Sequence, residues 1–335
     1  MSPKVTVLMS VFNGKEYLRE AIESILMQTF TDFDFIIIDD GSADETWETL
    51  TEYAGRDKRI ALFQNQENIG LTRSLNKGLK QAQGMYIARQ DADDVSLPER
   101  LELEVRYLDE NAEAVLVSSN VEIIDEMGRT LIISDRACDP DLVAWWMLFY
   151  NHVAGHSAVL FRRKNAIEAG GYDPSVKYAQ DYDLWLRLLG QGDLAILSEV
   201  LLRWRLHDDN VSVVAAEEQQ RFALRSARKA IGELAGETPS WEEMSALARF
   251  WRPHDFRTTK DMETTNRWLR RIVPSFLQQR CRNGADQAVL GTRIQEAIEG
   301  QFWLWFREVS FLRLPLFKLY MAARALQWRF VSVGD

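Results

Sequence analysis

Three acidic residues occupy four positions in Asp91-Ala92-Asp93-Asp94, just after the apolar run Met85–Ala88. Carboxylates this close repel one another unless a cation joins them. A hard divalent cation takes oxygen ligands, commonly one or two protein carboxylates together with substrate phosphates. The spacing therefore indicates a metal–diphosphate site at the end of a buried strand. A polar loop leading into a helix is the alternative, because Asp and Ser favour helix caps and Pro98 suits a first helical turn.

A second acidic pair follows another apolar run. Asp39 and Asp40 come directly after Phe35–Ile38 and are followed by Gly41-Ser42. One interpretation is a strand that ends in a turn and a helix cap, where these residue types are common. The other is a nucleotide pocket, in which a carboxylate accepts hydrogen bonds from a base N–H or a ribose hydroxyl.

The elements that must position these acids alternate between strand and helix. Apolar periodicity predicts, in order, a strand at Val5–Met9, a helix at 16–28, a strand at Phe35–Ile38, helices at 43–54 and 71–83, a strand at Met85–Ala88 and a helix from Pro98. Such alternation predicts an α/β fold with a mostly parallel sheet flanked by helices. Ligands of these sheets bind beyond the carboxyl ends of the strands, so both acidic clusters are expected at one crevice.

Composition excludes several classes of protein. The chain has 335 residues, 46% hydrophobic and 27% charged, which is typical of a globular protein. Residues 1–210 hold 36 acids and 21 bases, a net charge of −15, which argues against nucleic acid as a partner. The two cysteines form no disulfide framework and no metal-ligand spacing. No signal peptide is apparent, and we expect a cytoplasmic protein.

One uncharged run of twenty residues, Leu142–Phe161, has the length of a membrane span. Its second half contains Asn151, His152, His156 and Ser157. We therefore interpret it as a buried helix, a polar turn and then a buried strand at the end of the run.

The chemistry of the chain changes near residue 210. Residues 211–335 hold 14 acids and 19 bases, a net charge of +5, and include six of the eleven tryptophans. We predict a nucleotide-binding domain over 1–212 and a helical, aromatic-rich region over 213–335. Residues 302–330 combine Trp and Phe with Arg and Lys, as a helix in a membrane interface does. The alternative is that these aromatics pack as core.

An ordered set of short motifs resembles family 2 glycosyltransferases and extends over roughly the first 210 residues. The segments that carry the resemblance are Val5–Asn13, Ser24–Phe30, Ile36–Thr46, Asn68–Gly70, Leu75–Gly78, Gly84–Ala88, Asp91–Asp94 and Gln180–Arg187. The resemblance implies a GT-A fold, an α/β nucleotide-binding domain that uses a sugar nucleotide and Mn²⁺ or Mg²⁺. It also implies a set of nucleotide contacts, namely Ser10, Asp39, Asp40, Arg73 and Asp91.

The same resemblance implies roles for the remaining polar residues. Asp93, Asp94 and His207 are the expected metal ligands, with the choice between the two acids left open. Asp181 matches the family's general base, with Asp183 as the second choice. The family usually has Glu before this base, whereas here Gln180 precedes it. His156 matches a His on the acceptor side.

These observations predict an inverting, metal-dependent glycosyltransferase of bacterial polysaccharide and cell-envelope synthesis. Its expected donor is UDP-linked, and its acceptor is a hydroxyl of a glycan or a lipid-linked glycan at the inner face of the membrane. A sugar-1-phosphate nucleotidyltransferase is one alternative, although Ser10–Lys15 has only one Gly and one Lys to hold a triphosphate. A non-catalytic glycan- or nucleotide-binding protein on the same fold is the other.

Overall fold

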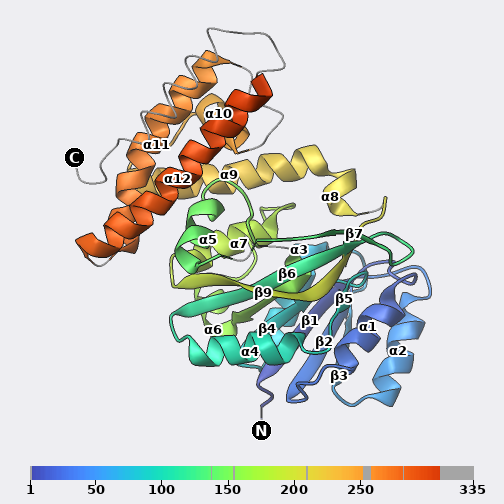
Figure 1. The fold of residues 1–335 in the computed structure, drawn as a ribbon. Coiled ribbons are helices and arrows are strands. Elements are labelled where there is room, and N and C mark those ends of the chain that lie inside the picture. Colours follow the sequence, from blue (N-terminus) through green and yellow to red (C-terminus); the bar gives the residue numbers. More distant parts are fainter. Residues whose placement is uncertain are drawn as a thin grey trace. The chain divides into compact units, whose positions relative to one another are not determined.

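The computed structural model describes residues 2–136, 138–153, 155–208, 210–251, 258–281 and 283–309 (Figure 1). The chain forms two compact units. The first contains Met1–Ala144 and Asn151–Ala223, and the second contains Trp145–Tyr150 and Leu224–Asp335. The later boundary between the two units falls after Ala223, within a helix. The predicted domain boundary after residue 212 stays a prediction.

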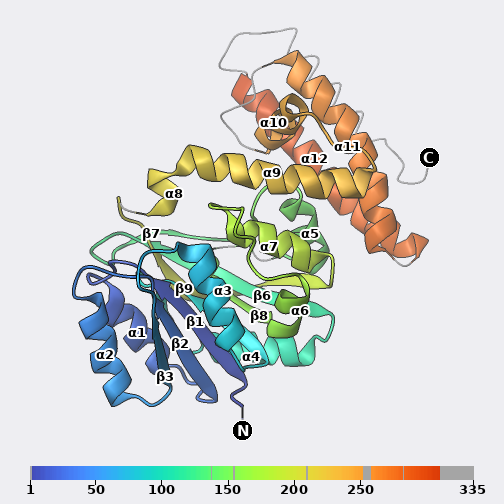
Figure 2. The ribbon, with the colours of Figure 1, turned by 180° about the vertical axis from the view of Figure 1, so that it is seen from behind.

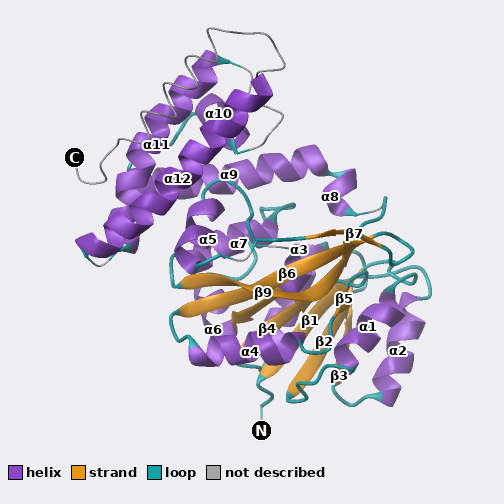
Figure 3. Ribbon diagram, viewed as in Figure 1, coloured by secondary structure: helices purple, strands orange, loops and turns teal. Residues whose placement is uncertain are grey.

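The first unit is built on a mixed sheet, which has nine strands among the described residues. Figure 3 shows its strands flanked by helices. The strands are β1 (Val5–Val11), β2 (Phe33–Asp39), β3 (Ile60–Gln64), β4 (Tyr86–Gln90), β5 (Val95–Ser96), β6 (Ala114–Ile124), β7 (Thr130–Ile133), β8 (Val159–Arg162) and β9 (Asp193–Arg205). Their order is β3-β2-β1-β4-β8-β6-β9-β5, and β7 pairs with β6.

Parallel pairing is concentrated in the amino-terminal half of this sheet. The pairs β1–β2, β2–β3 and β1–β4 are parallel, whereas β8 is antiparallel to both β4 and β6. The long strands β6 and β9 also pair in parallel. The prediction of a mixed sheet flanked by helices is therefore confirmed, with parallel pairing at β1–β4 and at β6–β9. The two acidic clusters of the sequence lie at the carboxyl ends of β2 and β4, on either side of β1.

Helices bury both faces of β1, which is why its apolar run is continuous rather than alternating. Val5, Val7 and Met9 belong to one core with α1 (Leu18–Leu26), α2 (Thr46–Arg56) and α4 (Arg100–Glu110). Helix α3 (Leu71–Gln81) lies on the opposite face, where Gly78 approaches Leu8 (Figure 2).

The uncharged run at 142–161 forms the elements that were predicted for it. Helix α5 (Pro140–Met147) is followed by a turn, a short 3-10 helix at His156–Ala158, and strand β8. Among the described residues, no helix is both long enough and apolar enough to cross a membrane.

The remaining helices of the first unit are α6 (Arg163–Glu168), α7 (Gln180–Leu189) and α8 (Val211–Val214). Helix α9 (Ala216–Ala235) leads into the second unit, whose described part is helical. Its other helices are α10 (Trp241–Phe250), α11 (Thr259–Arg280) and α12 (Gly284–Val309).

The core of the second unit is rich in aromatic rings. Trp145 packs edge-on against Trp251 and Phe276, with ring centroids 6.5 and 5.4 Å away. Phe302 is fully buried and lies 4.9 Å from Phe250. Phe302, the first residue of the segment 302–330, therefore packs as core, and the residues from 310 onward lie outside the described part of the chain.

Candidate functional site

A pocket of about 270 Å³ lies at the carboxyl ends of β1 and β4. One wall is the end of β1 and the loop after it, and the other is the acidic loop after β4, with a histidine that follows β9. The lining residues are Ser10, Val11, Phe12, Asn13, Gly14, Glu16, Tyr17, Asp91, Ala92, Asp93 and His207. The pocket therefore brings together four residues that the sequence singled out, namely Ser10, Asp91, Asp93 and His207.

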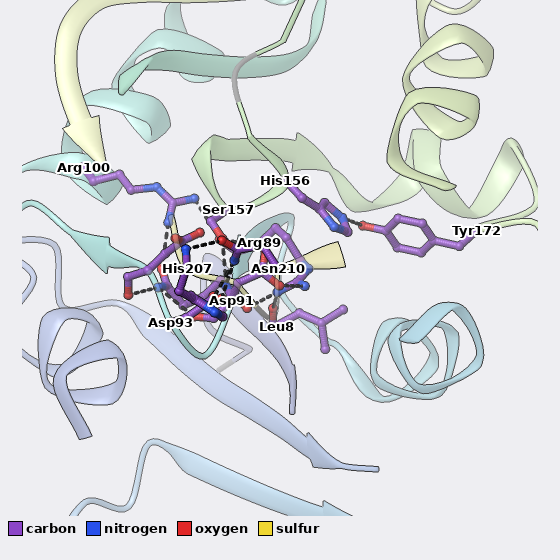
Figure 4. Close-up of polar contacts among 12 residues, drawn as sticks. Leu8, Arg89, Asp91, Asp93, Arg100, His156, Ser157, Tyr172, His207 and Asn210 are labelled. Carbon is purple, nitrogen blue, oxygen red and sulfur yellow. Dashed lines mark hydrogen bonds and ion pairs between the residues drawn. The ribbon is translucent and has the colours of Figure 1, made fainter. Parts of the chain in front are cut away.

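Asp91 is held by two residues that sequence reasoning did not identify. The fully buried Arg89 donates to Oδ1, and Ser157 Oγ donates to Oδ2 at 2.9 Å (Figure 4). Burial opposes ionisation of Asp91, but the charge of Arg89, the neighbouring His156 and the Ser157 hydroxyl outweigh it and hold its pKa below the ordinary value. Asp91 is therefore an ionised acceptor in the pocket wall.

Asp93 forms a small cluster with His207 and Asn210. Its Oδ2 lies 3.0 Å from His207 Nε2 and 3.3 Å from Asn210 Nδ2. Asn210 also accepts a hydrogen bond from the backbone N–H of His207 at 2.6 Å. Burial, and then the negative charge of Asp91, raise the pKa of Asp93. Asn210 was missed as a site residue, although it stands three positions after the histidine in the sequence.

Asp94 points away from the pocket. Its side chain is buried, and Oδ1 accepts a hydrogen bond from the backbone N–H of Arg205 at 2.9 Å. Arg205 in turn donates to the Asp93 carbonyl at 3.0 Å and lies over the ring of Tyr17, 4.5 Å from its centroid. Asp94 and Arg205 thus fasten the acidic loop to β9, and a metal-ligand role for Asp94 stays a prediction.

The donor atoms in the pocket fit a metal that is shared with a substrate. No group of three or more His, Cys, Asp and Glu side chains is arranged to hold a metal within the described part of the chain. The carboxylate oxygen of Asp93 suits Mn²⁺ and Mg²⁺, and the imidazole nitrogen of His207 is a softer donor beside it. Mg²⁺ usually takes few protein ligands and completes its shell with phosphate oxygens and water. The two residues therefore fit a metal–diphosphate site.

The Asp39–Asp40 pair does not line this pocket. Asp40 is buried, and its carboxylate accepts from Asn65 Nδ2 at 2.7 Å and Ser74 Oγ at 2.9 Å. It also accepts the backbone N–H groups of Ile69 and Gly70, at 3.0 and 2.9 Å, just before α3. These four donors match the acceptor capacity of a carboxylate. The Asp40 carboxylate therefore stabilises the start of α3.

The other two expected nucleotide contacts have different surroundings. Asp39 is fully buried and accepts from Ser42 N at 3.2 Å and Gln64 Nε2 at 3.0 Å. Arg73 lies exposed on α3, outside the lining of the pocket. Nucleotide contacts by Asp39, Asp40 and Arg73 stay predictions.

Asp181 lies in the first turn of α7 and is partly buried. Asn151 Nδ2 donates to its Oδ2 at 3.1 Å. Burial raises the pKa of Asp181, and the negative charge of Asp91 raises it further, so the two carboxylates lie within electrostatic reach. Asp183, the second choice for the base, is instead paired with Arg187 at 2.7 Å.

His156 lies between the pocket side and α7. Its Nε2 shares a hydrogen bond of 2.9 Å with the hydroxyl of Tyr172 (Figure 4). Its ring also packs edge-on against Trp185. Burial, followed by the charge of Arg89, lowers the pKa of His156 to about 3. The imidazole is therefore neutral at neutral pH and is held in place by Tyr172.

Comparison with known proteins agrees with this geometry. Residues 6–165 match the model of glycosyl transferase family 2. An uncharacterized glycosyltransferase of Haemophilus influenzae is 35% identical over 239 residues, which cover 68% of this chain and 73% of the relative. The amylovoran biosynthesis glycosyltransferase AmsE of Erwinia amylovora is 29% identical, over 69% of this chain and 89% of the relative.

Among solved structures, TarS 1–349 of S. aureus in complex with UDP-GlcNAc is similar with a TM-score of 0.58. It is 17% identical, and the match covers 97% of this chain and 89% of TarS 1–349. This likeness confirms the predicted GT-A fold. The chain therefore belongs to glycosyltransferase family 2, and the prediction that it is a glycosyltransferase is confirmed.

Proposed function

We propose that the protein is an inverting, metal-dependent glycosyltransferase that moves a sugar from a UDP-linked donor to a hydroxyl of a glycan or lipid-linked glycan. One observation carries the proposal. The pocket at the strand ends brings together Ser10, Asp91, Asp93 and His207. In this proposal Asp181, whose pKa is raised chiefly by burial, is the carboxylate that faces the incoming hydroxyl.

In this proposal the pocket binds the nucleotide diphosphate. Asp91 is held ionised and accepts hydrogen bonds from the ribose hydroxyls, while Asp93 and His207 hold the cation. When bound, Mn²⁺ or Mg²⁺ supplies positive charge that stabilises the leaving diphosphate. Ser10 and the loop after β1 form the opposite wall, against which the nucleoside packs.

Asp181 takes the proton from the acceptor hydroxyl. A general base must lie within hydrogen-bond reach of that proton and must have an open oxygen. The ion pair with Arg187 occupies Asp183, so the structure favours Asp181 over its neighbour. Because burial raises the pKa of Asp181, its carboxylate is more basic than an exposed one and better suited to the task.

The relatives support the substrate classes in this proposal. AmsE is named for amylovoran biosynthesis, which supports a polysaccharide acceptor, and TarS binds UDP-GlcNAc, which supports a UDP-linked donor. A lipid-linked acceptor would place the enzyme at the inner face of the cell membrane, with peripheral contact through residues 302–330.

A thermal-shift panel of nucleotides and nucleotide sugars, with and without Mn²⁺, tests the donor site. Ligands that bind only the folded state stabilise it, by about 2.7 kcal/mol at one hundred times Kd. We expect UDP and a UDP-sugar to raise Tm when Mn²⁺ is present, and EDTA to remove the shift. A response to GDP alone would overturn the UDP assignment, and equal shifts without metal would overturn the metal requirement.

The variant Asp181→Asn tests the base. We expect it to abolish sugar transfer while it keeps the Mn²⁺-dependent shift with UDP, because Asp181 lies outside the lining of the pocket. The exposed substitution Glu168→Gln on α6 serves as the control. Transfer by Asp181→Asn at a near wild-type rate would show that another group is the base.

A further inference from the structure

Asn151 contacts the candidate base directly. Its amide nitrogen donates to Oδ2 of Asp181 at 3.1 Å, across thirty residues of chain. Arg136 holds the backbone on either side of this contact, because its guanidinium donates to the carbonyls of Asn151 and His152 at 3.4 and 3.3 Å. Arg136 thus holds in place the backbone segment that carries the Asn151 amide.

The other end of the same amide is unsatisfied. Among the described residues, no donor reaches Oδ1 of Asn151, and the atom is buried. A buried polar atom without a partner costs about 1–3 kcal/mol, so native structures contain few of them. An apolar side chain of similar shape would remove this cost. Packing alone therefore does not explain the asparagine, and its one side-chain partner among the described residues is Asp181.

We propose that Asn151 is a positioning residue for Asp181, whose carboxylate it orients by donating to Oδ2 so that Oδ1 faces the acceptor hydroxyl. This inference rests on the proposed role of Asp181 as the base. The only other donors that act on the carboxylate are backbone N–H groups of Asp181 and Tyr182 in the first turn of α7, as far as the described residues show. Asn151 is the side chain that fixes the direction of the carboxylate.

The orientation of the amide agrees with an ionised Asp181. If the amide were turned over, its carbonyl oxygen would face a carboxylate oxygen, and the two would repel each other. A donated hydrogen bond favours the charged form of a carboxyl group. Loss of Asn151 should therefore make Asp181 harder to ionise as well as less well oriented, two effects that both slow transfer at acidic pH.

The variant Asn151→Leu removes the donor and keeps the size of the side chain. We expect kcat at pH 7 to fall about tenfold, which corresponds to the loss of one hydrogen bond to a charged group. We also expect the acidic limb of the pH–rate profile to move to higher pH. The KM for the donor and the UDP-induced shift in Tm should stay as in the wild type.

A purely structural asparagine would give the opposite pattern. Asn151→Leu would then lower Tm, and the acidic limb would coincide with that of the wild type, which would overturn the proposal. Asn165→Leu is the matched control, since Asn165 is a partly buried amide of the same unit that bonds only Gln191 among the contacts found. It should match the wild type in its pH profile.

A second variant covers the case in which Asn151→Leu does not fold. Asn151→Asp keeps the size and polarity but places a like charge beside Asp181, so the acidic limb should again move to higher pH. A limb that stays in place would overturn the proposal.

Titration of Asp181 by carboxyl ¹³C NMR, assigned with Asp181→Asn, separates this inference from the proposed function. If the wild type transfers no sugar, the function fails. A higher titration midpoint for Asp181 in Asn151→Leu would still support the contact, and an unchanged midpoint would overturn it.

Discussion

The acids near the strand ends differ in how many donors the protein already gives them. Asp40 receives four hydrogen bonds from protein groups, whereas Asp93 receives its contacts from His207 and Asn210 at the pocket wall. A carboxylate with no free lone pair cannot bind a ligand without giving up a partner. For a single acid, the number of hydrogen bonds that the protein donates to its carboxylate therefore distinguishes a residue that stabilises the fold from one that can bind a ligand.

Replacement of Asp40 distinguishes these two roles. Asp40→Asn removes the charge and half of the acceptor capacity at the start of α3, so the free energy of unfolding should fall by about 2–4 kcal/mol. Urea unfolding measures the loss. Binding of UDP to the folded fraction should persist. An unchanged urea midpoint combined with lost UDP binding would instead assign Asp40 to the nucleotide.

His152 makes the stability depend on pH. Burial, and then the charge of Arg136, lower its pKa from 6.5 to about 4. The unfolded chain therefore binds a proton below pH 6.5 that the folded chain binds only near pH 4. The free energy of unfolding is therefore highest above pH 6.5. It falls by at most about 3 kcal/mol as the pH drops toward 4.

The variant His152→Gln checks this dependence, because it removes the titrating group. Urea midpoints between pH 4.5 and 7.5 should vary less in the variant than in the wild type. If both proteins lose stability in parallel over that range, His152 is not the group responsible.

At the scale of elements, local periodicity predicted β1, β2, β4 and the helices between them, but it missed β3 (Ile60–Gln64), and the predicted end of α3 was wrong. The helix was expected over 71–83, with Gly84 just beyond it, and it ends at Gln81. Gly84 is instead required where the chain passes close to the backbone of β1. An added Cβ would lie 2.4 Å from the backbone nitrogen of Thr6, so only glycine allows β1 and the start of β4 to come this close.

The variant Gly84→Ala should therefore be strongly destabilising. Its methyl group would meet backbone atoms of β1, which cannot move aside as a flexible side chain can. We expect a loss of about 1–3 kcal/mol in the free energy of unfolding, as for other overpacked sites. Gly55→Ala on α2 is the control, because no atom lies within 4 Å of its added Cβ. Equal stability of the two variants would contradict the close approach.

Motif order and spacing also predicted four of the eleven residues that line the pocket, because strand ends of a parallel sheet lie at one edge. Arg89, Ser157, Asn151, Arg205 and Asn210 were not predicted. Their partners are distant in sequence or depend on side-chain direction, and neither periodicity nor composition reports such contacts. The long strands β6 and β9 escaped prediction for the same reason, since their pairing joins distant segments.

At the scale of the whole molecule, the two units do not follow one another along the chain. Residues Trp145–Tyr150 belong to the second unit, although the chain on both sides of them belongs to the first. Trp145, Met147, Leu148 and Phe149 are buried. The partners of Trp145 in that core include Trp251 and Phe276.

A chain truncated after Ala223 should therefore be poorly soluble. It keeps the whole sheet but lacks Trp251 and Phe276, so the aromatic side chains of Trp145 and Phe149 would lose partners. Large exposed apolar patches promote association. We expect a low soluble fraction and strong ANS fluorescence, both partly reversed by Trp145→Ser with Phe149→Ser. A monomeric truncated chain that does not bind ANS would contradict this expectation.

Because Trp145–Tyr150 belong to a unit whose other residues come later in the chain, these residues are synthesised before their packing partners. The ribosome releases Trp145–Tyr150 long before Phe276, and chains grow at roughly 5–20 residues per second. The aromatic side chains of this segment must therefore wait for roughly ten seconds, the time needed to make more than a hundred further residues at that rate. During that interval the nascent chain displays an apolar segment that a chaperone can bind, and the second unit ends the exposure when its helices arrive.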